Sequence, residues 1–277
     1  YTFTGVSADH TIEARFALDP ALAGTGWVGN GVPVTAATGD QELQAVIPDG
    51  AGGIIIAWRD QRSGEGDIYA QRLNAAGVPQ WVPDGVPLCM AAGHQDSPNI
   101  VSDGAGGAIV AWDDGRNGGL GSDLYAQRVS ATGVPQWTPD GMVVCAAADE
   151  QSSSKLAADG TGGAIAAWND HRSGSNFNIY AQRISPSGAA LWAPDGVPLA
   201  VLPSDQIGPV LAPDGAGGAI IAWSDRRSGL SYDIYAQRLG PGGAPLWPVA
   251  GVPLCSAAFD QTIPQIVGDG SAGSIAL

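Results

Sequence analysis

The sequence is poor in cations and has no long apolar run. Of its 277 residues, 12 are lysine or arginine and 27 are aspartate or glutamate, which gives a formal net charge of −15; Lys155 is the only lysine. Phosphate binding needs a basic patch, so this balance argues against nucleic acid as a partner. It argues equally against an anionic membrane surface. No apolar stretch approaches the length of a spanning helix, so we expect no membrane insertion.

Cysteine is also scarce. Cys89, Cys145 and Cys255 are odd in number and too few for a disulfide framework. They occupy one equivalent position of the repeat described below, so they should lie about one repeat apart. We expect them to be unpaired, buried, small apolar side chains.

The residues that usually mark an enzyme are few. The three histidines do not lie at metal-ligand spacing, and there is no G-x-S-x-G elbow, P-loop or HExxH motif. The sequence therefore predicts no catalytic residue, no metal and no cofactor. Carboxylates are abundant, however, so a paired-carboxylate glycosidase stays open as an alternative.

What the sequence does contain is a repeat of about 55 residues. An Asp-Gly turn motif starts at Asp49, Asp103, Asp159, Asp214 and Asp269, in steps of 54, 56, 55 and 55 residues. The nine tryptophans fall into two series that keep these steps: Trp27, Trp81, Trp137, Trp192 and Trp247, and Trp58, Trp112, Trp168 and Trp223. So constant a period indicates one structural unit used several times.

Each repeat predicts four short strands, here a to d. In residues 206–260, strand a is the apolar stretch "QIGPVLAPDG", strand b is "GGAIIAW", strand c is "DIYAQRL" and strand d is "GVPLCSA". The 41 glycines and 20 prolines gather mainly in the turns between them. Strand b is apolar throughout, which indicates burial on both faces.

Four antiparallel strands every 55 residues are typical of a β-propeller blade. We therefore expect an all-β propeller, with blades at about 41–94, 95–150, 151–205 and 206–260. A fifth blade is expected to be split between residues 11–40, which supply strands c and d, and residues 261–277, which supply strands a and b. Such sharing would close a five-bladed ring and remove exposed sheet edges.

The segment "PDGAGGAIIAWSDRRSGLSYDIYAQRL" resembles the TolB-type, WD-like propeller repeat. This resemblance covers strands a to c of four repeats and implies the fold rather than a function. The segment "YTFTGVSADHTIEARFA" resembles the end of a bacterial immunoglobulin-like or internalin-type B-repeat domain. On that alternative, residues 1–20 are the tail of a preceding domain and the chain is a piece of a longer surface protein.

Two repeated polar sets are candidate ligand-binding residues. Propeller connectivity places the b–c and d–a loops on one face. The b–c loops carry Asp60, Arg62, Asp114, Arg116, Asp170, Arg172, Asp225 and Arg227. The d–a loops, expected at the mouth of a central channel, carry Asp40, Gln41, His94, Gln95, Glu150, Gln151, Asp205, Gln206, Asp260 and Gln261. Both sets have a structural alternative, in which they only brace turns.

Because the blades look alike, and a catalytic centre usually makes one blade unusual, we predict a non-catalytic, lectin-like binding module. Its ligand would be a glycan or a protein on the b–c and d–a face. We expect an extracellular or cell-surface bacterial protein, monomeric or part of a longer chain. The alternatives are a glycoside-active propeller enzyme and a structural spacer in a large adhesin.

Overall fold

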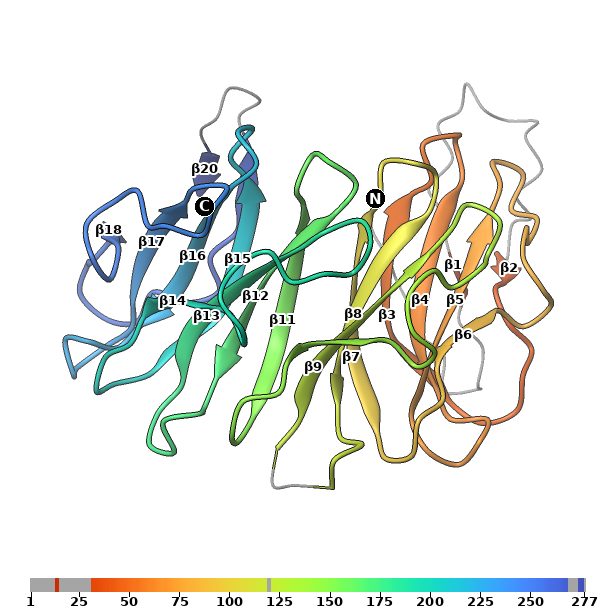
Figure 1. Cartoon of the computed structure of the whole chain (residues 1–277), viewed down its shortest axis with the longest axis horizontal. Coiled ribbons are helices and arrows are strands. Elements are labelled where there is room, and N and C mark those ends of the chain that lie inside the picture. Colours follow the sequence, from red (N-terminus) through yellow and green to blue (C-terminus); the bar gives the residue numbers. More distant parts are fainter. Residues whose placement is uncertain (1–12, 15–30, 119–120, 269–273, 277) are drawn as a thin grey trace.

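The protein is an all-β molecule. The computed structural model describes residues 13–14, 31–118, 121–268 and 274–276, and within these ranges every regular element is a strand. The prediction of an all-β propeller architecture is confirmed: the strands form successive four-stranded antiparallel sheets (Figure 1). No helix within these ranges is long and apolar enough to cross a bilayer.

Four complete blades follow one another along the chain. Blade 1 comprises β3 (Gln41–Pro48), β4 (Ile54–Asp60), β5 (Asp67–Leu73) and β6 (Val86–Cys89). Blade 2 comprises β7 (Gln95–Ser102), β8 (Ala108–Asp114), β9 (Asp123–Val129) and β10 (Met142–Cys145). Blade 3 comprises β11 (Gln151–Ala158), β12 (Ala164–Asp170), β13 (Asn178–Ile184) and β14 (Val197–Ala200). Blade 4 comprises β15 (Gln206–Pro213), β16 (Ala219–Asp225), β17 (Asp233–Leu239) and β18 (Val252–Cys255).

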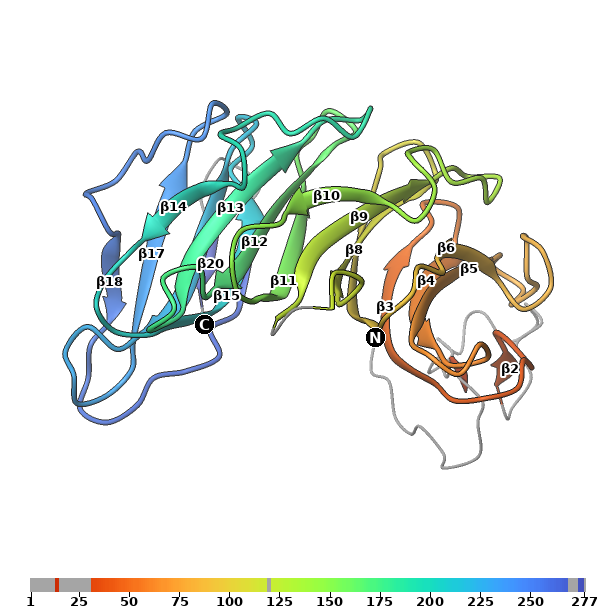
Figure 2. The same ribbon diagram turned by 60° about the horizontal axis from the view of Figure 1, so that its bottom comes forward.

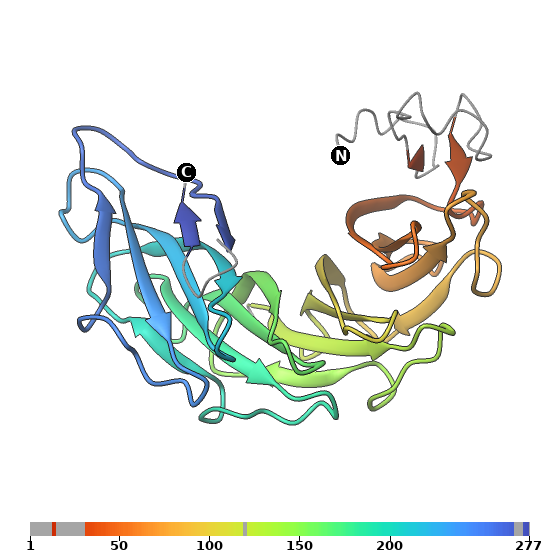
Figure 3. The ribbon, with the colours of Figure 1, turned by 90° about the horizontal axis from the view of Figure 1, so that it is seen from above.

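Two shorter sheets flank these blades. At the N-terminal side β1 (Glu13–Ala14) pairs with β2 (Val32–Pro33), and at the C-terminal side β19 (Ile266–Gly268) pairs with β20 (Ser274–Ala276). The blades follow an arc, and the two short sheets lie at its ends (Figure 3). In the described ranges they are separate sheets, so the shared fifth blade stays a prediction. The proposed immunoglobulin-like tail, residues 1–20, lies almost wholly outside these ranges.

The Asp-Gly motif forms the tight a–b turn. In blade 1 Asp49 Oδ1 accepts hydrogen bonds of 2.7 Å from the backbone amides of both Ala51 and Gly53. The other oxygen, Asp49 Oδ2, lies 2.9 Å from Arg72 Nη2 at the end of strand c. This arrangement recurs in blades 2 to 4, so the motif is a structural turn that fixes where strand b begins.

The core lies between neighbouring blades. Strand b is almost completely buried in every blade, as its apolar composition predicts. The "AW" tryptophans are fully buried, and Trp112 packs with Trp81 and Leu88 of the preceding blade. Figure 2 shows the sheets lying face to face, which is the packing that this core requires. The innermost strands β3, β7, β11 and β15 are neighbours in the same order.

The cysteines are free thiols, as expected from their spacing. Cys89 and Cys145 are buried, whereas Cys255 at the end of blade 4 is exposed. The expectation of burial therefore fails at Cys255, because in the described ranges no complete blade follows to cover it.

Candidate functional site

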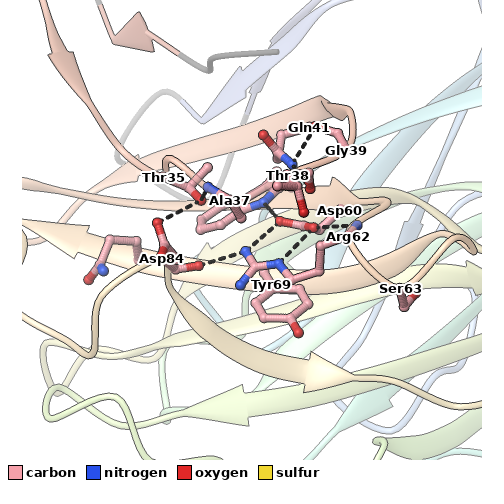
Figure 4. A network of polar contacts seen from close by, with 12 residues as sticks. Thr35, Ala37, Thr38, Gly39, Gln41, Asp60, Arg62, Ser63, Tyr69 and Asp84 are labelled. Atoms are coloured by element: carbon pink, nitrogen blue, oxygen red, sulfur yellow. Dashed lines mark hydrogen bonds and ion pairs between the residues drawn. The ribbon is translucent and has the colours of Figure 1, made fainter.

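The Asp-Arg pairs of the b–c loops form a brace inside each blade. In blade 1 the Asp60 carboxylate is fully buried, and Arg62 binds it through two hydrogen bonds, from Nε at 2.8 Å and from Nη2 at 2.6 Å. Trp58 Nε1 donates to Asp60 Oδ2 at 2.8 Å, and the Arg62 guanidinium lies 3.9 Å from the Tyr69 ring centroid (Figure 4). Burial alone would raise the pKa of Asp60, but the bonds from Arg62 and Trp58 outweigh it and lower that pKa.

The same brace recurs in the other three blades. Asp114–Arg116, Asp170–Arg172 and Asp225–Arg227 each make an ion pair of 2.6 Å, with the carboxylate fully buried. Each arginine also donates to a backbone carbonyl of the c–d turn, as Arg62 does to Asp84 at 2.8 Å. Both oxygens of each carboxylate therefore accept hydrogen bonds from the same chain. This is the structural alternative given above for this set, in which the residues brace turns.

The d–a residues divide into glutamines and flanking polar residues. The four glutamines that open β3, β7, β11 and β15 are buried, and their Nε2 groups donate to backbone carbonyls of the same d–a loop. Asp40, His94 and Asp260 are exposed, whereas Glu150 and Asp205 are half-buried. Of the flanking residues, Glu150 interacts electrostatically with Asp113, which is not among the residues predicted from the repeat.

Asp113 occupies a position at which the residue type differs from blade to blade. The residue after each opening glutamine is Glu42, Asp96, Ser152 or Ile207, and the residue opposite it on strand b is Arg59, Asp113, Asn169 or Ser224. Blades 1 and 2 therefore carry charged pairs on the innermost strand pair, and blades 3 and 4 carry neutral pairs. The blades are unlike at the inner strands, contrary to what the repeat predicts.

The charged pairs of blades 1 and 2 meet. Arg59 Nη1 lies 2.8 Å from Glu42 Oε1 and 3.9 Å from Asp96 Oδ2, across the boundary between the two blades. Asp96 faces Asp113 directly across the antiparallel pair β7–β8, where Cβ atoms are about 5 Å apart. Like charges placed directly opposite are unfavourable in a sheet. We call Glu42, Arg59, Asp96 and Asp113 the inner cluster.

A β-bulge adjoins each inner pair. The register shifts between Asp96 and Asn99 in blade 2 and between Ser152 and Lys155 in blade 3. Ser97 and Ser153 have φ values of 53° and 56°, which non-glycine residues seldom adopt. The bulge turns the Ser153 amide toward blade 2, where it donates to Asp113 Oδ2 at 3.3 Å. Bulges of this kind often lie beside functional sites, where they redirect side chains and amides.

Burial raises the pKa of Asp113 to about 7, and the negative charges of Asp96 and Glu150 act in the same direction. The Ser153 hydrogen bond and the Lys155 charge oppose the shift. Asp113 Oδ1 is buried and has no hydrogen-bond partner among the described residues, whereas the side chain of Asp96 is 40% exposed. The pair thus combines a carboxyl that is half protonated near neutral pH with a solvent-accessible one. Two carboxyl groups whose environments differ in this way can take different roles in acid–base chemistry.

No three histidine, cysteine, aspartate or glutamate side chains within the described ranges converge in a way that could hold a metal ion.

Comparison with known proteins gives the fold and no sequence family. No family model and no curated protein matches the chain. Among solved structures, it is similar to an α-L-arabinanase of Penicillium chrysogenum complexed with arabinobiose, with a TM-score of 0.54, 12% identity, and 86% of this chain and 74% of that chain covered. It is also similar to an α-L-arabinofuranosidase of Fusarium graminearum in complex with an iminosugar inhibitor, with a TM-score of 0.50, 8% identity and coverage of 86% and 74%. At these identities the likeness establishes the propeller fold alone.

These findings correct the prediction of a non-catalytic binding module, which was wrong. The two solved structures named above are an arabinanase and an arabinofuranosidase, both of them enzymes. The premise of that prediction also fails, because the inner cluster makes blades 1 and 2 unlike blades 3 and 4. The TolB-like and internalin-like resemblances remain predictions.

Proposed function

We propose that the chain is a glycoside hydrolase whose acid is Asp113. The observation that carries this proposal is the cross-strand pair Asp96–Asp113, in which one carboxyl has a pKa of about 7. Most glycoside hydrolases cleave the glycosidic bond with two carboxyl groups that lie in different environments. The activities named for the structurally similar arabinanase and arabinofuranosidase make arabinose-containing polysaccharides the first substrates to test.

In the proposed reaction, Asp113 donates its proton to the glycosidic oxygen as the bond to the leaving sugar breaks. The exposed Asp96 carboxylate stabilises the positive charge that develops on the remaining sugar. A water molecule then forms a bond to the anomeric carbon of that sugar and gives its proton to the Asp113 carboxylate, which restores the acid. Arg59 Nη1 lies 3.9 Å from Asp96 Oδ2 and 2.8 Å from Glu42 Oε1. Arg59 therefore holds the Asp96 carboxylate in place from the neighbouring blade. Because the substrate is a polymer, we also propose that the protein acts outside the cell.

The experiment is a screen of the purified chain for release of reducing sugar. It uses arabinan, an aryl α-L-arabinofuranoside and a panel of polysaccharides of other sugars. Asp113→Asn and Asp96→Asn should each lower kcat by at least about 100-fold, the typical contribution of a positioned acid or base. Asp140→Asn is the matched control: Asp140 lies in the c–d turn of blade 2, and its Oδ1 accepts a hydrogen bond from Met90 that an asparagine oxygen can keep.

Release of sugar by the unmodified chain, lost in both cluster variants and kept in Asp140→Asn, supports the proposal. An unmodified chain that cleaves nothing in the panel overturns it. So does an Asp113→Asn variant that is as active as the unmodified chain.

A further inference from the structure

A buried polar residue opens strand c in every complete blade: Asp67, Asp123, Asn178 and Asp233. Asp67 is 3% exposed, and its Oδ2 has no hydrogen-bond partner among the described residues. A buried carboxylate oxygen without a partner is unfavourable, so it calls for a donor or a cation from outside the chain.

Blades 2 and 3 supply an amide nitrogen at this place. Asn117 Nδ2 donates to Asp123 Oδ2 in blade 2, and Asn176 Nδ2 donates to Asn178 Oδ1 at 3.2 Å in blade 3.

The b–c loop of blade 1 has no such nitrogen. Ser63 stands at the position of Asn117, three residues after the buried aspartate of strand b, and Glu65 stands at the position of Asn176, two residues before strand c. The oxygen of Asp67 therefore faces a space that the other two loops fill with an N–H group.

In blade 3 this space is a cup of oxygens. Besides Asn178 Oδ1, the Asn176 Nδ2 atom lies 2.8 Å from the Leu202 carbonyl oxygen, 3.1 Å from that of Ser204 and 3.4 Å from that of Phe177. One amide group has two N–H donors, so it cannot satisfy four acceptors. Several oxygens around one point are the environment that a hard cation prefers.

Two carbonyls of this cup have counterparts in blade 1. In blade 3 the carbonyls of Phe177 and Ser204 accept hydrogen bonds from the amide and the side chain of the glutamine that opens blade 4. In blade 1 the carbonyls of Gly66 and Gly93 accept the same two bonds from Gln95, at 2.7 Å and 3.0 Å. The oxygen cup is therefore present in blade 1, with a carboxylate where blade 3 has an amide.

The charge of the blade 1 cup is also different. Glu65 is exposed, and its Oε2 accepts a hydrogen bond of 2.9 Å from the Gly93 amide, so a second carboxylate lies beside the cup. Asp60, directly opposite Asp67 on β4, is neutralised by Arg62. Burial raises the pKa of Asp67, and the charges of Asp60 and Glu65 raise it further. Two negative charges are thus left without a cation of this chain.

We propose that the oxygen cup of blade 1 is a Ca²⁺ site. Asp67 Oδ2 and the carbonyls of Gly66 and Gly93 are its ligands from within the fold, and Glu65 is its ligand on the solvent side. Water completes the six to eight oxygens that Ca²⁺ takes, and the two carboxylates balance its charge. With two acidic side chains the site falls outside the clusters of three considered above, and it does not depend on the proposed enzymatic activity.

The test is calorimetric titration of the EDTA-treated chain with CaCl₂, together with thermal unfolding. We expect one Ca²⁺ per chain with a Kd of about 0.1–1 mM, the range of extracellular Ca²⁺ modules. At a hundredfold excess over Kd the ratio of folded to unfolded chain should rise by about a hundredfold, and Tm should rise with it. MgCl₂ should have a smaller effect, because Mg²⁺ gives up its water reluctantly.

Three variants locate the site. Asp67→Asn should lose both the heat of binding and the Tm shift, whereas the matched control Asp233→Asn, at the equivalent position of blade 4, should keep both. Ser63→Asn leaves Asp67 in place and offers it the amide that Asn117 offers in blade 2. That variant should lose the Ca²⁺ response and, without Ca²⁺, unfold at no lower temperature than the unmodified chain, which separates a filled site from a damaged fold.

An unmodified chain that shows neither heat nor a Tm shift overturns the proposal. Binding that persists in Asp67→Asn assigns the cation to other carboxylates and overturns it too. So does equal loss in Asp67→Asn and Asp233→Asn, which would show an effect of overall charge.

Discussion

The backbone amide of Ser153 donates a hydrogen bond to Asp113 Oδ2 at 3.3 Å, so blade 3 holds a carboxyl that blade 2 contributes. This bond favours the charged form of Asp113, whereas burial and the charges of Asp96 and Glu150 favour the neutral form and prevail. The protonation state of the inner cluster is therefore set jointly by neighbouring blades, which makes it measurable by pH.

Hydrolysis should decline as pH rises through about 7, because Asp113 must be protonated to act as the acid. The measurement is kcat on the best substrate of the screen between pH 5 and pH 9. The high-pH limb should have a slope of one and its midpoint near 7. A rate that is constant up to pH 9 would contradict the assignment of Asp113.

The free energy of unfolding should also depend on the protonation of Asp113. Asp113 has a pKa of about 7 in the folded chain, above its usual value of 3.8, so the folded state binds more protons than the unfolded state between these values. Stability therefore falls as pH rises from about 4 to about 7, by on the order of 3 kcal/mol for this group. Urea unfolding of the unmodified chain and of Asp113→Asn at several pH values checks this. The difference in unfolding free energy between the two should change over that window and be constant above it.

Removing one brace should destabilise the fold strongly. Arg62→Met leaves the fully buried Asp60 carboxylate without its ion pair, which costs about 3–5 kcal/mol. Arg226→Met is the control, because Arg226 is exposed and its guanidinium lies 5.8 Å from the Tyr232 ring; a change of about 0.5 kcal/mol or less is expected. Equal midpoints for the two variants in urea would show that the brace is not structural.

A glycine beneath the buried tryptophan should not tolerate a methyl group. At Gly141 an added Cβ would lie 2.5 Å from the Trp112 ring, with φ at +85°. At Gly104 φ is +73° and no atom lies within 4 Å of the added Cβ. Gly104→Ala should cost about 1 kcal/mol from backbone strain alone, and Gly141→Ala about 1–3 kcal/mol more from overpacking. Thermal unfolding of the two variants measures the difference, which vanishes if Trp112 can move aside.

The repeat made most of the fold predictable. Strands b and c run close to where the apolar run of residues 219–223 and the "DIYAQRL" motif place them, because Asp-Gly and Pro-Gly turns delimit them. The bracing role of Asp60 and Arg62 could likewise be foreseen, since an identical pair in every blade suits a structural task. A comparison of the repeats, however, identifies only positions at which all blades have the same residue. The inner cluster lies at positions where the blades have different residues. The third residue of "AWRD", "AWDD", "AWND" and "AWSD" varies, and its role can be interpreted only when its cross-strand partner is known. The bulge at Ser97 and Ser153 had no signal in the sequence, because serine does not favour positive φ.

The near-identity of the blades has a consequence for folding. Strand b of one blade could pair equally well with strand c of the next, since "DIYAQR" and "DLYAQR" present the same side chains. What distinguishes the native partner is the length of chain to be closed. The native b–c connection is roughly tenfold shorter than the route to the following blade, an advantage of only about 2 kcal/mol in loop entropy. A refolding chain should therefore populate blade-exchanged species. Their number should grow with protein concentration, when a strand c from another molecule becomes as accessible as its own.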